Sequence, residues 1–154
     1  MFFYYPVHGF PGVSARLHYL SGGWRELSRR VEALRNQVAE RTGERPIVVG
    51  MDRYNIASEL AFYEPSSRGG SETLGRQLFI RGESLMYDYW YPTAAFEGKT
   101  LLLIAPRAEY FDDPRVEAHA ERLGPVQELK IEEHGTTPVL YYAQVVHGYR
   151  GAGR

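Results

Sequence analysis

The sequence predicts an α/β fold, a three-layer sandwich with a mostly parallel central sheet and an antiparallel edge hairpin at the C-terminus. Helical and extended patterns alternate along the chain, which is typical of parallel strands joined by helices. Two extended segments are continuously apolar, as expected for strands that are covered on both faces. The last two extended segments follow each other directly and suit a hairpin. At 154 residues the chain needs only one domain, which we place at residues 23–150.

The first 22 residues differ from the rest of the chain. They contain two prolines, several glycines and many aromatic residues without a sustained period. This composition predicts an irregular lead-in rather than a helix or a strand. Its opening residues, MFFYYP, would also fit the end of a membrane helix, because aromatic residues are enriched at the membrane interface. We therefore assign residues 1–22 as an irregular segment with a candidate juxtamembrane role.

The first helix is predicted from Trp24 onward. Apolar residues recur there at steps of three and four, with arginine, glutamate and glutamine between them. The residues of this apolar stripe are Trp24, Leu27, Val31, Leu34 and Val38. Ser21 is a candidate N-terminal cap and Gly43 a candidate C-terminal stop.

A buried strand and a second helix follow. Residues 46–50 contain β-branched residues without alternation, which predicts a strand buried on both faces. Residues 54–63 predict a helix that ends before Pro65 and turns four residues inward, namely Ile56, Ala57, Leu60 and Ala61. Residues 66–76 have the composition of a loop, and residues 77–80 are a short strand candidate.

The last third of the chain returns to extended patterns. We expect residues 82–99 to be mostly loop and residues 100–105, TLLLIA, to be a buried strand. Asp112-Asp113-Pro114 predicts the start of a helix that runs to about Leu123, since an acidic cap precedes a proline in the first turn. Residues 126–132 and 138–149 then predict the two strands of the terminal hairpin.

Composition excludes several classes of function. The net charge of −1 gives no electrostatic basis for binding nucleic acid. The chain has no cysteine, so disulfides, thiolate metal sites and a cysteine nucleophile are excluded. The five histidines are scattered without metal-ligand spacing, and no serine lies in a nucleophile elbow. We therefore expect no metal, no cofactor and no catalytic residues in this chain.

The first candidate binding segment is the corner in VVGMDRYNIASELAFYEP, where Asp52, Arg53 and Tyr54 join a buried strand to a helix. Ligands of open α/β sheets bind at this end of the strands. The dinucleotide fingerprint needs three glycines, however, and the corner has only Gly50. The alternative, which we favour, is that Asp52 caps the helix and Arg53 pairs with an acid such as Glu59.

The second candidate segment is LMYDYWYP, which contains Tyr87, Asp88 and Trp90. Aromatic faces around a carboxylate are what a sugar site requires, because the rings cover the C–H surface and the carboxylate accepts hydrogen bonds from hydroxyl groups. The alternative, which we again favour, is that these rings pack against the edge of the sheet.

Four segments in this order suggest a family: GWREL, DRYNIASELAFYEP, LMYDYWYP and GKTLLLIAP. Residues 18–110, which contain them, resemble the soluble C-terminal portion of bacterial membrane glycosyltransferases of the family 39 type. These enzymes are related to the protein O-mannosyltransferases and to the aminoarabinose transferases of lipid A. Such enzymes transfer a sugar from a polyprenyl phosphate donor at the outer face of the membrane, with acidic residues in a loop near the start of a multi-span chain.

The resemblance implies a non-catalytic extracytoplasmic domain, because this sequence has neither the membrane spans nor the acidic loop. The implied role is accessory: to recognise glycan or acceptor, or to cover the active site. The implied partners are the membrane-embedded part of the same enzyme and a glycan or polyprenyl phosphate.

Two alternatives remain open. The chain could be a free-standing α/β enzyme that acts on a phosphorylated or nucleotide substrate. It could also be an interaction module that forms a homodimer through the aromatic strand VLYYAQVVHGY, because an exposed edge strand can pair with a second copy.

Overall fold

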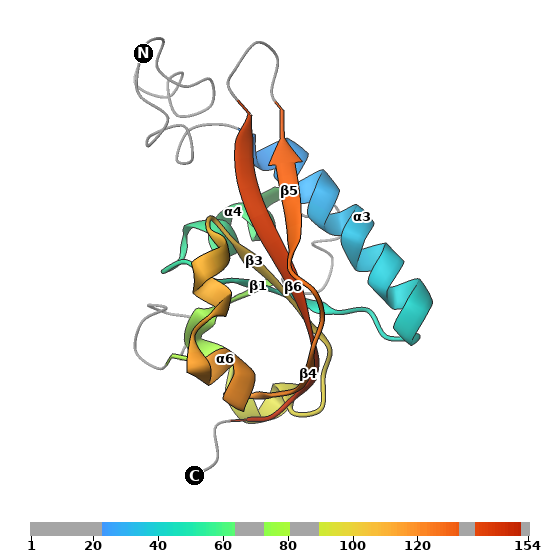
Figure 1. The fold of residues 1–154 in the computed structure, drawn as a ribbon, viewed down its shortest axis with the longest axis vertical. Coiled ribbons are helices and arrows are strands. Elements are labelled where there is room, and N and C mark those ends of the chain that lie inside the picture. Colours follow the sequence, from blue (N-terminus) through green and yellow to red (C-terminus); the bar gives the residue numbers. More distant parts are fainter. Residues whose placement is uncertain (1–22, 64–72, 81–89, 133–137, 152–154) are drawn as a thin grey trace.

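The computed structural model describes residues 23–63, 73–80, 90–132 and 138–151. In this part of the chain, helices cover both faces of a six-stranded mixed sheet (Figure 1). The helices and strands in chain order are α3 (Trp24–Thr42), β1 (Ile47–Gly50), α4 (Asn55–Tyr63), β2 (Thr73–Gly75), β3 (Leu101–Ala105), α6 (Pro114–Ala118), β4 (Ala120–Leu123), β5 (Gln127–Ile131) and β6 (Val139–Tyr149). Short 3₁₀ helices accompany them in the described ranges, namely η1 (Arg76–Leu78), η2 (Thr93–Phe96) and η3 (Ala108–Phe111).

The sheet has a parallel centre and antiparallel strands toward one edge. Strand β1 lies between β2 and β3 and is parallel to both, with Val48 opposite Thr73 and opposite Leu102. Strand β6 is antiparallel to β3, to β4 and to β5. The predicted α/β class, the parallel centre and the C-terminal hairpin are therefore confirmed.

The position of β6 differs from the expected edge. Its residues 142–146 pair with β3, while β5 and β4 pair with successive parts of its other side. The edge on this side of the sheet is therefore formed by β5 and β4. The reason is the length of β6, which has 11 residues and accommodates two shorter strands end to end.

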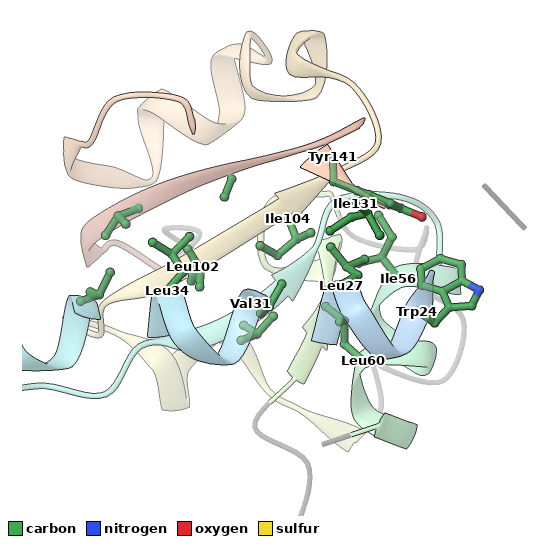
Figure 2. Close-up of a cluster of buried hydrophobic side chains, with 14 residues drawn as sticks. Trp24, Leu27, Val31, Leu34, Ile56, Leu60, Leu102, Ile104, Ile131 and Tyr141 are labelled. Atoms are coloured by element: carbon green, nitrogen blue, oxygen red, sulfur yellow. The ribbon is translucent and has the colours of Figure 1, made fainter. Parts of the chain in front are cut away.

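One face of the sheet is covered by α3 and α4. Along β3, Leu102 and Ile104 face these helices, because successive side chains of a strand point to opposite faces. Figure 2 shows Leu27, Val31 and Leu34 of α3 directed toward this face. The apolar stripe predicted for the first helix is confirmed, since all five of its residues are buried.

The other face of the sheet packs against η1, η3 and α6. Leu101 and Leu103 of β3 point to this side, where they join Leu78, Phe111 and Val116 in a second buried cluster. The sheet thus has one apolar layer on each face, and α3 and α6 lie on opposite sides of it (Figure 1). This arrangement explains why β1 and β3 have continuous apolar sequences.

The ends of α3 are set by glycines. Gly43 has φ of 72° and its N–H donates to the carbonyl of Ala39 over 2.8 Å, so the predicted stop is confirmed. Gly23 occupies the N-terminal cap position with φ of 79° and without a side-chain cap. The cap expected at Ser21 falls outside the described residues, as does the lead-in at residues 1–22.

Two of the predicted elements are wrong. Residues 77–80 do not form a strand; the strand is Thr73–Gly75, inside the segment expected to be a loop, and η1 follows it. The helix after Asp113 ends at Ala118, and residues 120–123 form β4 instead of its last turn. In both cases the strand is specified by pairing with a distant partner, β1 or β6, which a local pattern does not contain.

Candidate functional site

A cavity of about 640 Å³ opens where the parallel strands end. Strands β1, β2 and β3 run in the same direction, so their carboxyl ends meet at one edge of the sheet. Met51, Arg76 and Arg107 follow these ends directly or closely, and all three line the cavity. This edge is the usual ligand position in open α/β sheets. We call the space the strand-end cavity.

The apolar part of the strand-end cavity belongs to the second core cluster. Met51 is 2 % exposed, Phe79 is 6 % exposed and Val116 is fully buried. Phe79 packs edge-on against the ring of Tyr149, whose hydroxyl donates to the carbonyl of Leu78 over 2.5 Å. The long strand β6 therefore holds the segment that carries Arg76 and Phe79 in place.

Within the part of the chain that the structure describes, six charged residues line the strand-end cavity, three of each sign. The arginines are Arg76, Arg107 and Arg115, and the acids are Glu109, Asp112 and Asp113. Arg76 comes from the segment after β2, whereas the other five come from the segment between β3 and the first turn of α6. The formal charges of these six side chains sum to zero, so the described lining offers both donors for an anionic group and acceptors for hydroxyl groups.

Asp113 is the most strongly engaged of these acids. Its Oδ1 accepts hydrogen bonds from the backbone N–H and from Nε of Arg115, each over 2.9 Å, and its Oδ2 accepts from Nη2 over 2.7 Å. The predicted cap at the start of this helix is thus confirmed. The Arg115 guanidinium holds the pKa of Asp113 below its usual range, and the charge of Arg76 contributes in the same direction.

Arg107 and Tyr110 form the outer part of the wall. The guanidinium carbon of Arg107 lies 5.6 Å from the centre of the Tyr110 ring, a cation–π arrangement. Tyr110 is half-buried, whereas Arg107, Glu109 and Asp112 are exposed. The side chains that a ligand would meet first are therefore charged, with one aromatic ring among them.

Asp52, the first residue of the predicted corner at residues 52–54, has a structural role. Asp52 is only 4 % exposed. The N–H groups of Asn55 and Ile56 donate to its Oδ2 and Oδ1, each over 3.1 Å, so it caps α4 as the alternative interpretation expected. Arg53 and Tyr54 are exposed and do not line the strand-end cavity.

The ion pair expected between Arg53 and Glu59 is wrong. Within the described residues, neither side chain has an ion pair. Burial raises the pKa of the Glu59 carboxyl above its usual range.

Gly50 has a packing role. A Cβ atom added at Gly50 would lie 2.6 Å from the backbone nitrogen of Ala57. The glycine therefore permits α4 to approach the end of β1 closely.

The second predicted segment is only partly visible. Tyr87 and Asp88 fall outside the described residues. Trp90 is 60 % exposed, so it does not plug the sheet edge, and it does not line the strand-end cavity. Among the described residues of the two predicted segments, Met51, the residue before Asp52, is the one that lines the cavity.

Sequence reasoning missed the arginines of the strand-end cavity. Arg107 follows a correctly predicted strand, so the rule that ligands bind at carboxyl ends of parallel strands could have indicated it. Arg76 could not be found in this way, because β2 was not recognised. The motif Asp112-Asp113-Pro114 predicts a helix start, and Asp113 does cap α6. The motif does not indicate that Arg76, from a distant segment, lines the same cavity.

The described part of the chain contains no group of three or more His, Asp or Glu residues placed to hold a metal ion. Among the same residues, none of the helices has both the length and the apolar character needed to cross a bilayer. No family model matches the chain, and comparisons with curated proteins and with solved structures returned no match.

Proposed function

We propose that this chain is a non-catalytic, extracytoplasmic domain of a polyprenyl-phosphate-sugar-dependent membrane glycosyltransferase. Its role would be accessory: to recognise glycan, acceptor or lipid phosphate, or to cover the active site of the membrane-embedded part of the same enzyme. The proposal starts from the resemblance of residues 18–110 to the soluble C-terminal portion of such enzymes.

One observation supports a recognition role above all. One segment that carries the resemblance, GKTLLLIAP, contains β3, and another, DRYNIASELAFYEP, begins just after β1. The two strands are parallel neighbours, with Ile47 opposite Leu101 and Gly50 opposite Ile104. Segments that are distant in the chain are thereby brought to one edge of the sheet, and the strand-end cavity opens at that edge. A domain with only a spacing role would not need a cavity lined by charged and aromatic side chains at the position where α/β sheets bind ligands.

The contacts of Asp113 favour recognition over acid–base chemistry. A catalytic acid or base needs a carboxyl group that is within reach of the substrate and has a pKa near the working pH. Asp113 is bound by Arg115 and by the backbone of α6, and its pKa is lowered. It is therefore suited to positioning Arg115 rather than to accepting a proton.

The genomic sequence upstream of the Met1 codon gives the first test. Several apolar segments of about 20 residues encoded there would support the membrane-enzyme proposal. An in-frame stop codon directly upstream would contradict it.

Binding gives the second test. The ¹⁵N-labelled chain is titrated with oligosaccharides and with a short-chain polyprenyl phosphate, and amide shifts are mapped by NMR. We expect shifts that cluster at one surface of the domain. If no compound shifts any amide, the recognition role is wrong and an architectural role remains.

The strand-end cavity also favours one alternative, a free-standing α/β enzyme with a phosphorylated or nucleotide substrate. This alternative predicts turnover by the isolated chain, whereas the accessory role predicts binding without turnover. Incubating the chain with sugar phosphates and nucleotides, and following phosphate release and product formation by ³¹P NMR, distinguishes the two.

A homodimer remains a prediction, but strand β6 is no longer the expected contact between the two copies. Strand β6 is flanked by β3 on one side and by β4 and β5 on the other, so it is not an open edge. The edge strand β5 carries exposed Glu128 and Lys130, and charges of this kind disfavour pairing between copies. Sedimentation at several protein concentrations tests whether a dimer forms.

A further inference from the structure

We infer that the strand-end cavity binds a phosphorylated sugar, with Arg107 as a phosphate contact and Tyr110 as the surface on which the sugar ring lies. The inference rests on the proposed function and deepens it, because it names a ligand class and the residues that recognise it. The location follows from the structure alone.

The arginines argue for a phosphate group. Arg76 reaches the cavity from the segment after β2, and Arg107 and Arg115 reach it from the segment between β3 and the first turn of α6. Guanidinium groups present planar pairs of N–H donors that match phosphate oxygens. The charge of Arg76 acts on Asp113, so these two segments lie near each other at the cavity. A phosphate bound in the cavity would therefore interact with arginines from both segments.

The carboxylates limit how much negative charge the ligand carries. Glu109 and Asp112 are exposed at the same cavity and would repel a polyphosphate. The same carboxylates accept hydrogen bonds from hydroxyl groups. A ligand with one phosphate and several hydroxyl groups therefore fits the six charges better than a nucleoside triphosphate or a neutral sugar does.

Tyr110 and Phe79 supply the apolar surface that a sugar ring needs. Both line the cavity, and Phe79 is held by the ring of Tyr149. Arg107 lies over Tyr110, so a phosphate bound to this guanidinium would leave the attached sugar beside the Tyr110 ring. The cavity volume of about 640 Å³ lies within the range of small-molecule sites, which is about 300–1,000 Å³.

The test compares four ligands on the full ¹⁵N-labelled chain: glucose 1-phosphate, glucose, inorganic phosphate and a short-chain polyprenyl phosphoglucose. We expect glucose 1-phosphate to shift the amides of Met51 and of residues 107–116. Glucose and inorganic phosphate should each bind at least about tenfold more weakly, because each lacks one half of the interactions. Comparison of the first and last ligands shows whether the free or the lipid-linked sugar phosphate is preferred.

Two variants and a matched control locate the contacts. Arg107→Gln should lower the affinity for glucose 1-phosphate about tenfold to a hundredfold, which corresponds to the loss of hydrogen bonds to a charged group. Glu109→Gln should lower the affinity for glucose 1-phosphate by a smaller factor. It should leave the affinity for inorganic phosphate unchanged or raise it. Arg41→Gln removes an exposed arginine from α3, on the other face of the sheet, and should change nothing. Circular dichroism confirms that each variant is folded.

The outcomes separate this inference from the proposed function. The inference is overturned if glucose 1-phosphate shifts no cavity residue, if inorganic phosphate binds equally well, or if Arg107→Gln binds like the Arg41→Gln control. The proposed function survives such a result when oligosaccharides or polyprenyl phosphate shift another surface, such as that around Arg53 and Tyr54. The proposed function itself is contradicted when none of the ligands binds and no membrane segments are encoded upstream.

Discussion

At the scale of single residues, two aspartates begin helices in this chain and differ in what they do besides. Asp52 is buried and accepts hydrogen bonds from two backbone N–H groups of α4. Asp113 caps α6 and also holds the Arg115 side chain at the strand-end cavity. The same local rule therefore produces a structural residue at one corner of the sheet and a positioning residue at the neighbouring one.

Replacing Asp52 by alanine tests its assignment as a cap. Asp52→Ala leaves the N–H groups of Asn55 and Ile56 without these acceptors, and we expect a loss of about 1–2 kcal/mol in the free energy of unfolding. Asp52→Asn retains an acceptor and should cost less. Urea denaturation measures both. An Asp52→Ala variant as stable as the parent, but with altered ligand binding, would contradict the capping role.

His147 makes stability depend on pH. Burial lowers its pKa below the ordinary 6.5, and the charge of Arg122, its partner across β4 and β6, lowers it further. The unfolded chain therefore takes up this proton at higher pH than the folded protein. The contribution to stability is complete above about pH 6.5 and is lost as the pH falls toward the lowered pKa.

Two variants test this assignment. Arg122→Gln should raise the pKa of His147 in an NMR titration without restoring the ordinary value, because burial remains. His147→Gln should reduce the loss of stability between about pH 6.5 and 5 relative to the parent. An unchanged pKa in Arg122→Gln would show that the arginine charge does not reach the imidazole.

At the scale of elements, the unit from β1 to α4 depends on how closely a strand and a helix pack. Gly50 is the last residue of β1, and the backbone of Ala57 in α4 lies beside it. Gly50 is the single glycine of a corner that lacks the three-glycine dinucleotide fingerprint. Its actual surroundings are protein backbone, so its small size serves the packing of α4.

Gly50→Ala should therefore destabilise the fold. The added methyl group would lie 2.6 Å from the nitrogen of Ala57, which cannot move without shifting α4. We expect a cost of about 1–3 kcal/mol, typical of overpacking a core. Gly124→Ala is the control, because its added Cβ would meet the carbonyl oxygen of Val145 at 3.4 Å. Equal unfolding midpoints for the two variants would disprove the close approach of α4.

At the scale of the whole molecule, β3 joins two apolar layers. Leu102 faces α3 and Leu103 faces the cluster that supports the strand-end cavity, and both are fully buried. Among the described residues, strands β1, β3 and β6 contribute side chains to both layers. A ligand in the strand-end cavity would contact side chains of the layer that contains Leu103. Their positions therefore depend on that layer more than on the layer that contains Leu102.

Alanine substitutions in β3 test the two layers. Leu102→Ala and Leu103→Ala should each cost about 2–5 kcal/mol. Only Leu103→Ala should also perturb the amides of residues 107–116 in an NMR spectrum of the folded protein, because it lies beneath the segment that lines the cavity. If Leu102→Ala perturbs these amides equally, the layers are not independent.

The sequence alone determined the elements whose information is local. The stripe from Trp24 to Val38, the apolar run of β3 and the cap at Asp113 each depend on neighbours within one or two turns, so their patterns are visible in the chain. The α/β class follows from the alternation of such elements.

Only the tertiary structure decided which segments pair and what they enclose. Strand β2 is three residues long and exists because β1 lies beside it; β4 replaces the last turn of an expected helix because β6 offers it a partner. The strand-end cavity combines Met51, Arg76 and Arg107 from the segments that follow three different strands, and no local pattern connects them. Backbone pairing between distant segments and the packing of side chains across them are long-range interactions, so a reading of local periodicity does not contain them.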